Sequence, residues 1–193
     1  MASDKTKPGK AVGLRVTGFR ASGVAAGIKK NGRKDLALIV SDKPAQVAGL
    51  FTTNSVKAAP VLLDMKRVKK GVSSGLIVNS GNANACTGAD GAKKAEAMTA
   101  FAEKALGYDG IPSAGEAMMT TDAFQKLGER RARIGGREVV IAGLCKGAGM
   151  ICPNMATMLA FFLTDADIKA PLLSEALKIA VNASFNSIIV DND

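Results

Sequence analysis

The sequence predicts an α+β fold in which strands and helices form stacked layers. Short apolar segments bounded by turn residues indicate strands, and two stretches with apolar residues at helical spacing indicate helices. The strand segments come in runs with helices between them, which favours a layered sheet-and-helix sandwich over a regular βαβ alternation. With 193 residues, 47% of them hydrophobic, the chain can bury a substantial core.

The first half of the chain is expected to consist mainly of strands. Ser41, Asp42 and Pro44 predict a turn between two apolar segments, which then resemble a β-hairpin or meander. Two more apolar segments of this length follow before the pattern changes. The four predicted strands cover residues 35–40, 46–53, 59–63 and 75–79.

The second half mixes helices with strands. Residues 92–106 have apolar positions at helical spacing, with Asp90 available as N-cap and Gly107 as the C-terminal stop. Pro171 is expected to open a second helix whose apolar face includes Leu173 and Leu177. Further strands are predicted at 137–142, directly after the Gly135–Gly136 turn, at 157–163 and at 187–190.

The chain is predicted to form a polar N-terminal extension, residues 1–10, followed by a single α+β domain, residues 11–193. The best apolar run, 155–163, is too short to cross a bilayer. Cys86, Cys145 and Cys152 form no CxxC pair, and no secretory signal precedes them. We therefore expect a soluble cytoplasmic protein with reduced thiols.

Composition narrows the chemistry that the chain can perform. It contains no His, which excludes Ser-His-Asp and Cys-His hydrolysis and His-ligated zinc, and no metal site is expected. Catalysis must use Thr, Ser, Cys, Lys, carboxylates or an amine. The net charge is +9, but the basic clusters are scattered and lack interleaved aromatic residues, so no nucleic-acid partner is expected. The charge could steer a small anionic substrate.

Two segments are unusually biased in composition. Residues 79–88, NSGNANACTG, form either an Asn/Gly-rich turn or a loop whose amides face a polar pocket. Residues 145–164, CKGAGMICPNMATMLAFFLT, lead through small residues to Thr157 and then to an apolar run. A threonine with a free α-amine carries its own base, because that amine has a pKa of about 7.7–8.0. The second segment therefore fits a self-cleaving N-terminal nucleophile, although a buried Thr at the start of a strand is the plainer alternative.

Several blocks give the chain a resemblance to the ornithine acetyltransferases, also called glutamate N-acetyltransferases, of arginine biosynthesis. The resemblance extends from about Lys10 onward, and the KGAGM..PNMATMLAF block is its most specific part. The matching blocks, in order, are GVAAGIKKNGRKDLALI, FTTN with KAAPVLL, NSGNANACTG, EAMMTTD, KGAGMICPNMATMLAF and SFN-IIVD.

The resemblance implies a self-processing fold like that of N-terminal-nucleophile enzymes. Members of this family cut themselves before the threonine of the MATML motif, here between Ala156 and Thr157, into α and β chains that form heterodimers. Thr157 would then carry acetyl from N-acetylornithine to glutamate as an ester. Some members also use acetyl-CoA as co-substrate, and no other cofactor is implied. The family's substrate-binding lysine and threonine map to Lys146 and Thr120.

Two departures from the family pattern leave a second function class open. The STGVIG-type loop, which supplies the family's oxyanion hole, is not found between Leu106 and the TTD motif. The family's VDGDTSTND is shortened to VDND, and the remaining half, with a catalytic glutamate, has no counterpart here. The alternative function is therefore a non-catalytic shortened variant or fragment that acts as a scaffold or binding module.

Overall fold

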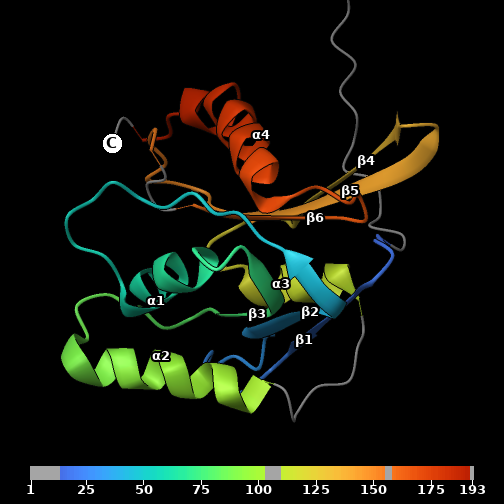
Figure 1. Cartoon of the computed structure of the whole chain (residues 1–193). Coiled ribbons are helices and arrows are strands. Elements are labelled where there is room, and N and C mark those ends of the chain that lie inside the picture. The colour runs from blue at the N-terminus through green and yellow to red at the C-terminus, as the bar shows by residue number, and fades with distance from the viewer. Residues whose placement is uncertain (1–13, 103–109, 155–157, 192–193) are drawn as a thin grey trace, which may run out of the picture.

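The computed structural model describes residues 14–102, 110–154 and 158–191, which contain two three-stranded antiparallel sheets (Figure 1). The N-terminal sheet has the strand order β1-β2-β3 and the C-terminal sheet the order β4-β5-β6. The mixed, layered α+β class predicted from the sequence is confirmed. The strands are β1 (Phe19–Val24), β2 (Leu36–Gln46), β3 (Val72–Asn79), β4 (Lys126–Ile134), β5 (Arg137–Lys146) and β6 (Leu159–Thr164).

Four α-helices and one short 3-10 helix accompany the sheets. α1 and α2 pack against each other beside β3, and α4 lies over the side of β6 (Figure 1). α3 contacts both sheets, most closely β1 and β2 and then β5. The helices are α1 (Ala59–Val68), α2 (Gly88–Ala102), α3 (Ile111–Met118) and α4 (Ala170–Asn182), and the 3-10 helix η1 spans Phe185–Ser187.

The core lies where α3 joins the two sheets. Ala114 and Ala117 of α3 are completely buried, because only small side chains let a helix approach the sheets this closely. Gly23 of β1 is required for the same reason: a Cβ there would overlap the backbone carbonyl of Ser113. Met118 and Leu144 add the bulk of the apolar contact. This packing fixes the segment that directly follows α3.

Several predicted elements are confirmed with different bounds. α2 begins four residues before the predicted start at 92, so Asp90 lies in its first turn, where it pairs with Lys94, instead of capping it. The strand predicted at 137–142 is β5, and the Gly135–Gly136 turn before it has two positive φ angles. Pro171 opens α4 as expected. Gly107 lies outside the described residues.

Three strand predictions are wrong. β2 runs straight through Pro44, because a register shift between Val40 and Ala45 removes the need for a ladder N–H there. The hairpin or meander predicted between 35–40 and 46–53 therefore does not form, and 47–53 is not a strand. Residues 59–63 begin α1, where Pro60 occupies a position that suits the start of a helix. Residues 187–190 contribute the end of η1 and a single bridge between Val190 and Ile151.

Candidate functional site

The two residues that the resemblance assigns to substrate binding lie side by side. The Lys146 ammonium donates a hydrogen bond of 3.0 Å to the Thr120 hydroxyl, although the residues are 26 positions apart. Lys146 ends β5, and Thr120 follows α3 after the extended residue Met119. Thr120 is exposed and Lys146 is half-buried, so a small molecule can reach this pair from solvent. A hydroxyl beside an ammonium suits a carboxylate or carbonyl ligand.

Asp122 ties the two sides of this pair together, and sequence reasoning missed it. Its buried carboxylate accepts hydrogen bonds from the backbone N–H groups of Gly147, at 2.9 Å, and Thr120, at 3.3 Å, and from the Lys126 ammonium. Burial by itself raises the pKa of Asp122, but these donors outweigh it and bring the pKa down to about 2. Because Gly147 is the neighbour of Lys146, one carboxylate holds both backbone segments.

A second buried carboxylate supports the site from the connection between β1 and β2. Asp35 accepts hydrogen bonds from three backbone N–H groups, those of Ala26, Ile28 and Lys29. Burial raises the pKa of Asp35, yet these amide donors keep it below its ordinary value. The Lys29 ammonium reaches across to the Met119 carbonyl, at 2.6 Å. The backbone just before Thr120 is therefore fixed from outside its own helix.

The predicted nucleophile, Thr157, and the cleavage partner, Ala156, lie outside the described residues. The residues that follow them are described: Leu159 pairs with Lys146 across β5 and β6, and Met158 is buried. The chain thus returns to the C-terminal sheet directly opposite Lys146, two residues after Thr157.

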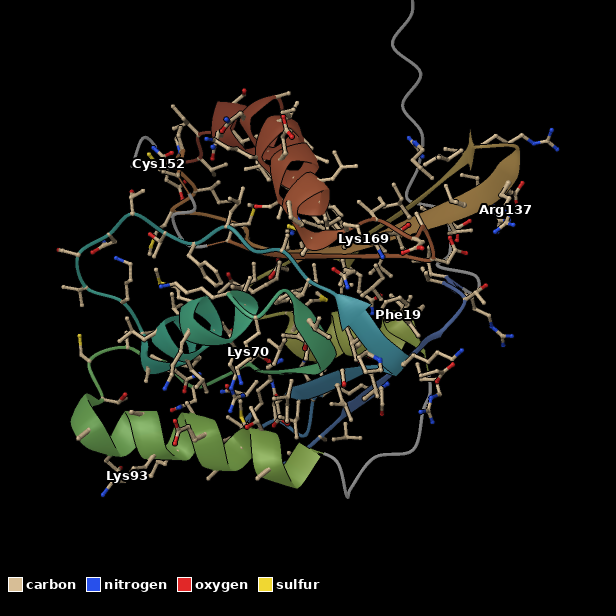
Figure 2. The ribbon with its side chains drawn as sticks, viewed as in Figure 1. Phe19, Lys70, Lys93, Arg137, Cys152 and Lys169 are labelled. Atoms are coloured by element: carbon tan, nitrogen blue, oxygen red, sulfur yellow. The ribbon has the colours of Figure 1, made fainter. Side chains whose placement is uncertain are left out.

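The loop that precedes the predicted cleavage point is held by the C-terminal segment. The Met150 N–H donates to the Asp191 carboxylate at 3.1 Å, and the Asn154 N–H donates to the Asn186 side chain at 3.0 Å. Both donors have positive φ angles, which non-glycine residues rarely adopt. Cys152 lies on this loop (Figure 2). The KGAGMICPN and SFN-IIVD blocks, distant in sequence, are therefore one structural unit.

The Asn-rich segment forms a polar loop with its own small cavity. The Asn84 amide donates to Asn79 at 2.8 Å and accepts from Asn82 at 3.0 Å. Cys86 has a φ of 56°, a left-handed value that favours turn formation. Asn79, Asn82 and Asn84 also line a cavity of about 490 Å³. The left-handed Cys86 fits the turn interpretation, and the cavity lined by asparagines fits the polar-pocket interpretation.

The described residues contain no group of three or more His, Cys, Asp or Glu side chains that could hold a metal ion. All three cysteines are unpaired, and burial raises the pKa of the Cys145 thiol above its ordinary value, which disfavours a reactive thiolate there. No helix in the described part of the chain is long and apolar enough to span a membrane.

Comparison with known sequences finds one family. A sequence model of the ArgJ family matches residues 20–113 and 109–193. The arginine biosynthesis bifunctional protein ArgJ of Geobacter sulfurreducens is 46% identical over 215 residues, covering 93% of this chain and 55% of that protein. The protein of the same name from Caldanaerobacter subterraneus is 42% identical over 211 residues, covering 91% and 52%. The chain spans about half the length of the curated relatives it matches.

The family-model match and the Geobacter alignment together show where this chain differs from its relatives in sequence. The match to the family model is divided into two segments, which overlap at residues 109–113; we call this point the interruption. The alignment with the Geobacter protein is 215 residues long, and it includes 93% of this 193-residue chain. About 35 residues of the Geobacter protein within the alignment therefore have no counterpart in this chain. The interruption falls where the sequence lacks the STGVIG-type loop.

Solved structures give the same result. ArgJ from Bacillus halodurans superimposes with a TM-score of 0.67 at 30% identity, over 75% of this chain and 92% of that chain. The ornithine acetyltransferase from Mycobacterium tuberculosis, solved in complex with ornithine, gives a TM-score of 0.60 at 30% identity, over 75% of this chain and 94% of that chain.

Proposed function

Because this chain belongs to the ArgJ family, we propose that it carries the nucleophile-bearing part of an acetyltransferase of arginine biosynthesis. The observation that carries the proposal is the hydrogen bond between Lys146 and Thr120 at the end of β5, opposite the strand that follows Thr157. These contacts support the proposal, in which the Lys146 ammonium and the Thr120 hydroxyl would bind substrate and Thr157, two residues before Leu159, would be the nucleophile. The donor would be N-acetylornithine, or acetyl-CoA if the chain is bifunctional, and the acceptor glutamate.

The first step of the proposed mechanism is self-cleavage. The Thr157 hydroxyl attacks the carbonyl carbon of Ala156, the C–N bond of that peptide breaks, and the acyl group moves from nitrogen to oxygen. Water then hydrolyses this ester, leaving a carboxylate on Ala156 and a free α-amine on Thr157. The lengths of two similar proteins support such a division. This chain covers 92% of the solved Bacillus chain but only 55% of the Geobacter relative, so the solved chain is much shorter than the Geobacter protein.

The second step is acetyl transfer by a ping-pong route. The α-amine of Thr157, with a pKa of about 7.7–8.0, takes the proton of the hydroxyl as its oxygen attacks the acetyl carbonyl. The amide bond breaks, ornithine leaves with a proton on its amine, and acetyl remains as an ester on Thr157. The amine of glutamate then attacks this ester and releases the hydroxyl. Lys146 and Thr120 would position the substrates through their polar ends.

A transfer assay tests this proposal. The chain is incubated with acetyl-labelled N-acetylornithine and glutamate, and labelled N-acetylglutamate is measured. We expect Lys146→Met and Thr120→Val to lower kcat/KM by about tenfold or more, because each removes a substrate contact. Lys93→Met, on the exposed surface of α2 (Figure 2), is the matched control and should leave kcat/KM unchanged. Equal activity of all three variants would contradict the assigned roles.

One observation favours the second function, that of a non-catalytic scaffold or binding module. The family match is interrupted where the oxyanion loop would lie, and loss of one oxyanion donor costs about 10²–10³ in turnover. Ligand binding separates the two functions. A scaffold would bind ornithine, detected by calorimetry, with Lys146→Met abolishing the heat, while no acetylated protein forms from N-acetylornithine. Accumulation of a protein species heavier by one acetyl group would exclude it.

A further inference from the structure

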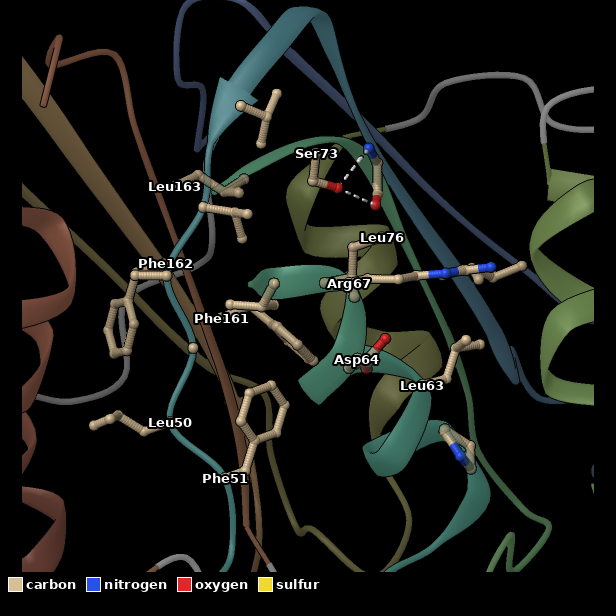
Figure 3. A pocket seen from close by; sticks show the side chains of 18 of the residues that line it. Leu50, Phe51, Leu63, Asp64, Arg67, Ser73, Leu76, Phe161, Phe162 and Leu163 are labelled. Atoms are coloured by element: carbon tan, nitrogen blue, oxygen red, sulfur yellow. Dashed lines mark hydrogen bonds between the residues drawn. The ribbon is translucent and has the colours of Figure 1, made fainter. Parts of the chain in front are cut away.

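A cavity of about 710 Å³ lies between the two sheets, in a region that no residue of α3 lines (Figure 3). We call it the edge groove. It is bounded by residues 72–77 of β3, residues 160–163 of β6 and the extended segment 46–51, and it is covered by parts of α1 and α4. Phe51, from segment 46–51, and Phe161, from β6, both point into it (Figure 3). Nothing in the proposed acetyl transfer uses this space.

The residues that line the groove show that it runs along strand edges. Side chains alternate between the two faces of a sheet, so a cavity over one face is lined by every second residue. β2 follows this rule and contributes Leu38 and Val40, whereas β3 contributes six consecutive residues and β6 four. The groove therefore opens onto one face of β2 but onto the edges of β3 and β6.

Both of these strands have a free edge. β3 and β6 are terminal in their sheets, and within the described residues each pairs with a single strand, β2 and β5 respectively. At Gly75 the hydroxyl of Ser73, two residues earlier in β3, bonds with both the backbone carbonyl and the backbone N–H, at 3.0 and 3.4 Å (Figure 3). About 20 Å of β3 edge faces the groove, which is the length of an ordinary strand.

The two helices beside the groove, α1 and α4, have almost no buried residues, unlike helices that pack fully against a core. None of the residues of α1 is buried, and Val181 is the single buried residue of α4. Phe162 of β6 is 48% exposed and Val72 of β3 is 43% exposed. An apolar wall next to unpaired strand edges suits an extended apolar chain, which satisfies backbone hydrogen bonds and apolar contacts together.

The sequence comparison identifies what would fill this space. The relatives carry about 35 residues that this chain lacks, and the family match is divided into two segments that meet at 109–113, after α2. α2 follows β3 directly, and its residues Ala95, Met98 and Thr99 line the groove. Consecutive strands neighbour each other in about two thirds of cases, so a strand that came after β3 and α2 would most often return to β3. Since β2 occupies one edge of β3, the free edge is the place for it.

From these observations we infer that the edge groove is a binding site for an extended apolar strand that pairs with the free edge of β3, and that the segment which the relatives carry after α2 contains such a strand. In this chain the site is open to such a strand from another molecule. The inference concerns binding alone and does not depend on the proposed acetyl transfer.

A peptide titration tests the inference. The probe is a synthetic peptide with the residues of the Geobacter relative that fall opposite the interruption, added to the isotope-labelled chain. We expect saturable NMR shifts confined to the groove, and slower amide exchange at 72–77. A peptide N-methylated at alternate residues, which cannot complete a ladder, and a scrambled peptide should each bind at least about tenfold more weakly.

A matched pair of variants locates the site on the protein. Leu177→Glu introduces a charge into the groove, and Ile179→Glu introduces the same charge on the same helix outside it. We expect the first to weaken peptide binding about tenfold or more and the second to change it by less than about twofold. Equal binding of the scrambled or N-methylated peptide would overturn the inference. So would sedimentation showing that a second copy of the chain already fills the groove.

Discussion

The two sides of the space between the sheets are packed in opposite ways. On the side of α3, Ala114 and Ala117 are completely buried, and the buried carboxylates of Asp35 and Asp122 have a full set of donors. On the side of the edge groove, α1 has no buried residue. The Thr120–Lys146 pair is on the packed side, because Thr120 comes shortly after α3 in the chain. We therefore expect this chain alone to fix the geometry of the Thr120–Lys146 pair, whereas the open side is the proposed site for a strand that this chain lacks.

The largest effect expected from this contrast comes from a methyl group on the packed side. Gly23→Ala places a Cβ against the backbone carbonyl of Ser113, which no side-chain rearrangement relieves, so we expect a loss of about 3 kcal/mol in the free energy of unfolding. Gly128→Ala is the matched control in β4, because a Cβ there meets no atom within 4 Å. Urea unfolding of both variants measures the difference. Equal stability would show that α3 is not tightly packed.

The pH dependence of stability gives the next effect. The pKa of Asp122 is about 2 in the folded protein and 3.8 ordinarily. A lowered folded pKa stabilises the protein above the ordinary value, and this contribution is lost as the pH falls from about 4 through 2. We expect Asp122→Asn to lose about 2 kcal/mol at pH 7 and almost nothing at pH 2. Urea unfolding at both pH values tests this, and a pH-independent difference would contradict the assigned charge.

Asp64 of α1 supplies the smallest effect, with the opposite sign. Burial beside the edge groove raises its pKa, and Arg67 opposes this shift only in part. A raised folded pKa makes the charged carboxylate unfavourable at neutral pH, a cost that disappears as the pH falls below the ordinary value. Because Asp64 is half-buried and water screens it, we expect Asp64→Asn to stabilise the chain by a few tenths of a kcal/mol at pH 7. Thermal unfolding at pH 7 measures this, and a loss of stability would contradict it.

Local sequence signals predicted the elements that depend on them. Pro171 with leucines at helical spacing predicted α4, and Gly135–Gly136 predicted the turn before β5. Pro44 misled as a turn signal, because it lies at a register shift within β2, and the apolar pattern of 59–63 misled as a strand signal, because Pro60 begins a helix there. Whether a proline ends a strand or begins a helix depends on neighbours that a short segment does not contain.

The sequence predicted which side chains form the candidate site, but not which residues hold them in place. The resemblance assigned Thr120 and Lys146, and the structure brings them together. Asp122 could not be assigned from the sequence, because its partner Gly147 is 25 positions away and contributes only a backbone N–H. The roles of Asn186 and Asp191 could not be predicted for the same reason, since both side chains accept hydrogen bonds from backbone N–H groups of a distant loop.

Intact mass under denaturing conditions shows whether the chain cuts itself before Thr157, as we propose. We expect two species, residues 1–156 and 157–193, formed slowly because the oxyanion loop of the family is not found in the sequence, and a single uncut species for Thr157→Ala. A single species of full mass after prolonged incubation, the same as that of Thr157→Ala, would contradict it.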